Sequence, residues 1–240
     1  MKIFTALAMA AIATATILPA TAKADETVKQ KLETYKEGFV QKAPQDKQDD
    51  YEEGIRMVRE SGVLERAKNV GDTAPDFTLQ NAAGQRVNLS DTLAEGPVVL
   101  IWYRGEWCPY CNIYLEDIQE NVDKFEEAGA KVIAISPAKP DQSWSAEEKE
   151  GLKFHVLSDE GSAVAEEYGV VYTLPSKIAE YYQKAFNLSA VNGDDRNLLP
   201  LSASYVIGQD GVISYAYLNA DYRERAETSV LIEEVKKLGE

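Results

Sequence analysis

The chain has 240 residues and carries 25 basic side chains against 40 acidic ones, a formal net charge of −15. This acidity argues against binding to the phosphate backbone of nucleic acids, which needs clustered lysine and arginine, and against docking on anionic lipids. One histidine and two cysteines are too few ligands for a tetrahedral zinc site, and we predict neither a metal nor a cofactor.

Residues 1–24 have the pattern of a secretory signal peptide. Lys2 precedes an apolar, alanine-rich stretch, and Ala22-Lys23-Ala24 is a small-x-small cleavage sequence. The stretch is short for a membrane span, and no later segment is long and apolar enough to be one. We therefore expect a protein without a membrane span that is secreted across the inner membrane, and that is periplasmic if the source is Gram-negative.

Residues 25–67 are polar, and their apolar side chains recur every three or four positions. This spacing predicts two amphipathic helices joined near Pro44. We expect this N-terminal helical extension to pack on the domain that follows and not to be needed for the chemistry. A role as a dimer arm is the alternative, so a homodimer stays open.

Strand and helix patterns alternate from residue 70 to residue 240. Strands are predicted at 87–89, 97–103, 131–136 and 154–157, a hairpin at 203–218, helices at 113–127, 145–150, 162–168, 175–186 and 228–238, and a polar loop at 189–197. Such alternation with a terminal hairpin predicts one α/β domain, a central mixed sheet flanked by helices on both faces.

The only two cysteines, Cys108 and Cys111, stand three residues apart between the apolar strand 97–103 and the next helix. A helix N-terminus stabilises a thiolate, so the order predicts a lowered pKa for Cys108. In this interpretation Cys108 attacks and Cys111 resolves. A passive disulfide is the alternative, but so short a loop constrains the unfolded chain little. The motif itself suits both peroxide reduction and disulfide exchange.

Few other side chains qualify for the site. Arg104 stands four residues before Cys108, where a guanidinium can stabilise a thiolate or hold a peroxide oxygen; a surface ion pair with Glu106 is the alternative. His155 lies in a predicted strand and is not assigned to the site. Arg196, beside acidic neighbours, is predicted to form a local salt bridge, and Arg225 to form a cap or surface pair near the last helix.

Several motifs resemble one family. They are Val70–Phe77, Leu157-Ser158-Asp159, Tyr205–Ile213 and, more narrowly, Tyr103–Asn112. Together they resemble the peroxiredoxin-like branch of the AhpC/TSA superfamily over residues 70–239. The resemblance implies a thioredoxin-like fold and a thiol-dependent peroxidase. In such an enzyme a Cys108 thiolate reduces hydrogen peroxide or organic hydroperoxides through a sulfenic acid and a Cys108–Cys111 disulfide, and a thioredoxin-like or other thiol reductant recycles the disulfide.

Two positions depart from the patterns that the resemblance implies. Peroxiredoxins carry Pro-x-x-x-Thr/Ser-x-x-Cys, but, counted from Cys108, Ile101 and Gly105 replace the proline and the hydroxyl residue. We therefore expect a peroxide pocket with one hydrogen-bond donor fewer than in peroxiredoxins that have the full pattern. Thioredoxin-type oxidoreductases need a cis-proline before the hairpin, where Ser202 stands. A periplasmic thiol–disulfide oxidoreductase and a non-catalytic binding module remain as alternatives.

Overall fold

The computed structural model describes residues 26–140 and 151–239. The predicted signal peptide and the helix predicted at 145–150 lie outside the described residues. In the described part of the chain, no helix is both long enough and apolar enough to cross a membrane.

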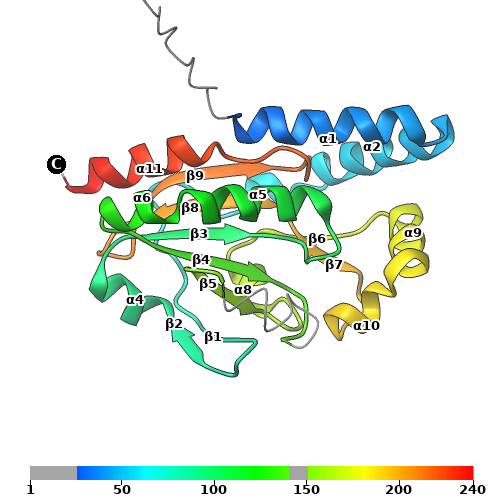
Figure 1. Cartoon of the computed structure of the whole chain (residues 1–240). Helices are drawn as coiled ribbons and strands as arrows, with labels where there is room; N and C mark the ends of the chain where they lie inside the picture. The colour runs from blue at the N-terminus through cyan, green and yellow to red at the C-terminus, as the bar shows by residue number, and fades with distance from the viewer. Residues whose placement is uncertain (1–25, 141–150, 240) are drawn as a thin grey trace, which may run out of the picture.

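A mixed seven-stranded sheet runs through the centre of the molecule (Figure 1). Its strand order is β2-β1-β5-β4-β3-β8-β9, with β3, β4 and β5 parallel and the other neighbouring strands antiparallel. The strands are β1 (Thr78–Asn81), β2 (Arg86–Asn88), β3 (Val98–Trp102), β4 (Lys131–Ser136), β5 (His155–Ser158), β8 (Ser202–Ile207) and β9 (Ile213–Asn219). The predicted central mixed sheet is thus confirmed.

Helices cover both faces of this sheet, as predicted. They are α1 (Val28–Lys42), α2 (Gln45–Arg59), α3 (Val63–Arg66), α4 (Leu89–Glu95), α5 (Pro109–Glu120), α6 (Val122–Glu127), α8 (Ala163–Glu167), α9 (Ser176–Phe186), α10 (Leu188–Asn192) and α11 (Thr228–Lys236), followed by a 3-10 turn at Lys237–Gly239. In Figure 1, α1, α5, α6 and α11 lie on one side, with α4 and α8 on the other.

The central strand β3 explains the two-sided core. Its five residues are all buried, and successive side chains point to opposite faces. Val99 and Ile101 pack with α1, α5, α6 and α11, whereas Leu100 and Trp102 pack with α3, α4 and α9. A run of apolar residues of this kind is typical of a strand buried on both faces.

The structure differs from the sequence prediction in three places. The single helix predicted at 113–127 is two helices, because Asn121 leaves helical geometry and its side-chain amide donates to the Asp117 carbonyl at 2.8 Å. The predicted loop at 189–197 overlaps α10, which ends at Asn192. A further two-stranded sheet pairs β6 (Val171–Thr173) with β7 (Leu198–Pro200). Elements of three to five residues are too short to show a period in the sequence.

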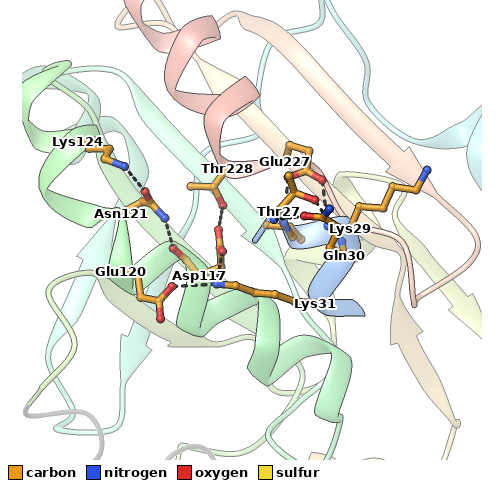
Figure 2. Close-up of polar contacts among 11 residues, drawn as sticks. Thr27, Lys29, Gln30, Lys31, Asp117, Glu120, Asn121, Lys124, Glu227 and Thr228 are labelled. Atoms are coloured by element: carbon orange, nitrogen blue, oxygen red, sulfur yellow. Dashed lines mark hydrogen bonds and ion pairs between the residues drawn. The ribbon is translucent and has the colours of Figure 1, made fainter. Parts of the chain in front are cut away.

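Residues 26–67 form the predicted helical extension, and Pro44 immediately precedes α2. Figure 2 shows how α1 is fixed to α5 and α11. Lys31 Nζ lies 2.7 Å from an Asp117 carboxylate oxygen, and Thr228 Oγ1 donates to the other at 2.6 Å. The Glu227 carboxylate accepts the backbone N–H groups of Val28 and Lys29, where a helix start favours negative charge.

Candidate active site

The two cysteines lie at the predicted strand-to-helix junction. Cys108 is the N-cap residue of α5, Pro109 is its first helical residue, and Cys111 follows in the first turn. Both side chains are buried, with 2% and 0% of their surface exposed, and both thiols are free. Proline suits this position because the first helical N–H has no partner within the helix.

Cys111 carries the thiol with the lowered pKa. Burial opposes its ionisation. The hydrogen bond with Cys108 and the charges of Arg225 and Arg104 outweigh burial and lower the pKa of Cys111 to about 5. The donors are close, because Arg225 Nη2 lies 3.2 Å and the Arg104 backbone N lies 3.5 Å from the Cys111 sulfur. This sulfur is therefore a thiolate at neutral pH.

Cys108 has the opposite environment. Burial raises the pKa of its thiol, and the neighbouring Cys111 raises that pKa further through their hydrogen bond and its charge. Its sulfur lies 4.0 Å from Arg104 Nη1, a longer contact than those at Cys111. The prediction of a Cys108 thiolate is thus wrong for this arrangement. The nearer donors, at 3.2 and 3.5 Å, lie at the Cys111 sulfur, so the geometry also favours the thiolate at Cys111.

Arg104 faces the cysteine pair and not the solvent. Its side chain is 1% exposed, so the alternative of a surface ion pair is wrong. The guanidinium carbon lies 4.0 Å from the ring centre of Tyr222 and 5.0 Å from those of Trp107 and Tyr182. Such aromatic faces stabilise a buried cation. Its Nε has no hydrogen-bond partner among the described residues.

Arg225 is the functional candidate that the sequence analysis missed. It was predicted to form a cap or surface pair, but it is 7% exposed and contacts the Cys111 sulfur. The neighbouring Arg223 holds this segment in place through Asp221 and through a two-pronged contact with Glu52 of α2, at 2.6 and 3.0 Å. Nothing in the spacing of the sequence indicates this arrangement.

Gly105 is not a vacant position for a hydroxyl side chain. Its φ is +136°, and a Cβ there would lie 2.5 Å from Trp107 Nε1. That indole is in turn stacked on Phe186, with 4.4 Å between the ring centres. Counted from Cys111 instead, the Thr/Ser position of the peroxiredoxin pattern falls on Cys108. The spacing of the pattern therefore also allows Cys111 to be the attacking cysteine, which an alignment of the pattern on Cys108 does not indicate.

The remaining candidates lie as predicted. His155 is exposed in β5, away from the cysteine pair. Arg196 makes its local salt bridge with Asp194 at 2.6 Å. Ser202 begins β8 in a backbone that has no cis peptide bond in the described ranges.

The chain is similar to known peroxiredoxins. A family model described as "AhpC/TSA family" matches residues 70–216. Peroxiredoxin Bcp of Escherichia coli K12 is 32% identical over 148 residues, 61% of this chain and 83% of that protein. Chloroplastic peroxiredoxin Q of Sedum lineare is 30% identical over 168 residues, 69% and 78% of the two chains. Among solved structures, peroxidoxin BcpB of Mycobacterium tuberculosis superposes with a TM-score of 0.55 at 22% identity, covering 71% of this chain and 97% of that one.

Proposed function

The chain belongs to the AhpC/TSA family, and on that premise we propose that it is a peroxidase that reduces hydroperoxides through the Cys108–Cys111 pair. The peroxiredoxins Bcp and Q, which are its relatives, support this reaction class. The observation that carries the proposal is the Cys111 sulfur. It accepts from Arg225 and from the Arg104 backbone, and it lies beside a second thiol. A stabilised thiolate with an adjacent resolving thiol is the arrangement that peroxide reduction needs.

The reaction balances within the pair. The Cys111 thiolate attacks one oxygen of the hydroperoxide, the O–O bond breaks, and Cys111 becomes a sulfenic acid. The departing oxygen takes the proton of Cys108 and leaves as water or an alcohol. The Cys108 thiolate so formed attacks the Cys111 sulfur, the S–O bond breaks, and hydroxide departs, which takes a proton from solvent. The peroxide gains two electrons, and the pair ends as the Cys108–Cys111 disulfide.

Arg104 supplies positive charge where negative charge develops on the departing oxygen. Its guanidinium lies beside the Cys108 sulfur and has a free Nε–H. A donor fixed in a buried site stabilises such charge strongly, because no solvent has to reorganise. We therefore assign Cys108, Cys111 and Arg104 to the catalytic site and add Arg225 as the group that holds the Cys111 thiolate.

A thioredoxin-like or other thiol reductant returns two electrons and one proton to the disulfide, which restores the Cys108 thiol and the Cys111 thiolate and completes the cycle. We further propose that residues 1–24 direct export, which places the enzyme in the periplasm of a Gram-negative source. N-terminal sequencing of the protein recovered from the cell tests this, and a chain that still begins at Met1 contradicts it.

The oligomeric state is tested by light scattering, in which a homodimer would have twice the mass of the single chain.

The burial of both sulfurs favours peroxide over protein disulfides as the first oxidant. A thiolate that attacks a protein disulfide must reach a sulfur on another folded chain, and neither sulfur is at the surface. A peroxide has only two oxygens at its reactive end. The disulfide-oxidoreductase alternative therefore requires the site to open before the first step.

Stopped-flow tryptophan fluorescence tests the proposal, because Trp107 adjoins the pair. We expect the reduced protein to be oxidised by one equivalent of hydrogen peroxide with the loss of 2 Da, about 10³-fold or more faster than free cysteine thiolate, since preorganised donors of this kind are worth 10²–10³ each. Oxidation no faster than that of free thiolate, with rapid exchange on a protein disulfide, would replace the peroxidase with an oxidoreductase.

A further inference from the structure

A small cavity ends at Arg104. Its volume is about 10 Å³, and it is lined by α2, α9, the segment after β9, Arg104, Tyr172 of β6 and residues 174–175. The Arg104 side chain forms its charged wall, whereas the rest of the lining is aromatic or aliphatic, including Tyr182 and Tyr222. The cavity therefore leads to Arg104, whose guanidinium Nη1 lies 4.0 Å from the Cys108 sulfur and whose backbone N lies 3.5 Å from the Cys111 sulfur.

The size of the cavity limits what enters. A cavity of about this volume holds a single water molecule. Hydrogen peroxide exceeds water by one oxygen atom, so small side-chain movements admit it. An aryl or long-chain alkyl group is many times larger and has no room beside Arg104. Packing against the rings of Tyr182 and Tyr222 resists a large expansion, because close-packed interiors transmit strain.

The roof of the cavity belongs to the N-terminal extension. Tyr51, Ile55 and Val58 of α2 all line it. The helix approaches α9 closely at Gly54, where a Cβ would lie 2.8 Å from Ile178 Cγ1. The two-pronged contact between Glu52 and Arg223 ties the same helix to the segment that carries Tyr222 and Arg225. The roof thus has a fixed position over the cavity.

The floor provides a donor for a small polar guest. Arg104 Nε is buried without a partner among the described residues, and an unpaired buried donor costs free energy. A peroxide oxygen that reaches Arg104 Nε can accept this N–H. The cavity thus combines an unpaired hydrogen-bond donor on Arg104, room for one small molecule and apolar side chains of α2 above it.

From this geometry we propose that the α2 roof makes the enzyme selective for hydrogen peroxide over bulky organic hydroperoxides. The proposal rests on the proposed peroxidase function and names its substrate class. It also gives the extension a role in the reaction, since the walls of the cavity are incomplete without α2.

Oxidation of the reduced full-length chain by hydrogen peroxide and by cumene hydroperoxide tests this, each rate being divided by the rate of free cysteine with the same peroxide. We expect the normalised ratio to favour hydrogen peroxide by roughly tenfold or more, as steric discrimination in a narrow pocket permits. Ile55→Ala widens the roof and should raise the cumene hydroperoxide rate selectively. Val58→Ala, a smaller truncation, makes the same test if Ile55→Ala does not fold.

Met57→Ala is the matched control, because Met57 lies on the exposed side of the same helix. It should leave the ratio unchanged. A normalised ratio near one in the unmodified protein overturns the selectivity but not the peroxidase. A high ratio that neither roof truncation lowers also overturns it, because the discrimination would then arise elsewhere. Absence of oxidation by either peroxide overturns the peroxidase itself.

Discussion

The guanidinium of Arg225 lies 3.2 Å from the sulfur of Cys111, although 114 positions separate the two residues in the chain. This contact selects which of two neighbouring thiols carries the negative charge. The dipole of α5 acts at the N-terminal end of the helix, where Cys108 is the N-cap residue and Cys111 lies in the first turn. The charge of Arg225 and the N–H that it donates distinguish the two thiols, and they favour ionisation of Cys111.

The pH dependence of oxidation follows from this charge. The folded pKa of Cys111, about 5, lies below its ordinary value of 9.0, so the thiolate persists above pH 6 and is lost as the pH falls through 5. We expect the rate of oxidation by hydrogen peroxide to be flat from pH 6 to 8 and half-maximal near pH 5. Stopped-flow fluorescence from pH 4 to 8 measures it. A half-maximum near pH 9 would contradict the assignment.

Arg225→Met removes the charge and keeps much of the packing. Loss of an opposite charge at this distance raises a pKa by about 1–3 units, so the half-maximal pH should rise by that amount. Arg196→Met is the control, because Arg196 makes an exposed salt bridge to Asp194. The control should keep the original profile. An unmoved half-maximum in Arg225→Met would mean that another group lowers the pKa of Cys111.

The roles of the two cysteines can be separated by serine substitutions. Cys108→Ser retains the attacking thiolate, so it should consume one peroxide per chain and accumulate a sulfenic acid, which dimedone traps. Cys111→Ser should react slowly, because the pKa of Cys108 is raised. Mass spectrometry measures the amount of dimedone adduct that each of the two variants forms. An adduct in Cys111→Ser alone would restore the assignment made from sequence order.

Arg104→Met tests the buried guanidinium. Methionine retains packing among the rings of Trp107, Tyr182 and Tyr222 but supplies no donor. We expect oxidation to slow by roughly a hundredfold, the usual effect of removing one preorganised donor. Arg104→Lys, which keeps the charge, should recover part of the rate. Equal rates in Arg104→Met and the unmodified protein, measured by stopped flow at pH 7, would exclude a catalytic role for the guanidinium.

Gly105→Thr introduces the hydroxyl side chain that the peroxiredoxin pattern has three residues before the cysteine, counted from Cys108. The structure predicts damage and no gain, because a Cβ would collide with the Trp107 indole. Overpacking of this kind costs about 1–3 kcal/mol of unfolding free energy. Gly84→Thr is the control, since Gly84 also has positive φ but open space around it. Urea unfolding should show the larger loss for Gly105→Thr, and faster oxidation by that variant would contradict the model of the site.

Asp117→Asn tests the attachment of the extension. Asp117 is buried and joins Lys31 of α1 to Thr228 of α11 (Figure 2). Weakening a buried, charge-assisted hydrogen bond should cost about 1.5–3 kcal/mol in urea unfolding. Limited proteolysis should then cut within residues 26–67 earlier. Asp123→Asn, which breaks an exposed pair with Lys153, should cost less than about 1 kcal/mol.

The sequence by itself determined the architecture and the place of the chemistry. The apolar run of β3, the helical spacing after it and the two cysteines between them are local features, and local periodicity is enough to predict them. The N-terminal helices were predicted for the same reason, because each buries one stripe of apolar residues. The spacing of these apolar residues does not indicate which part of the protein each helix packs against.

Only the tertiary structure decided which sulfur holds the charge and what reaches it. Arg225 comes to Cys111 from a segment after the last strand, and Glu52 reaches Arg223 across 171 positions. The sheet and the packed helices bring these residues together, and a sequence pattern carries no information about such distant neighbours. The strength of a charge interaction depends on distance and burial, which exist only in the folded chain.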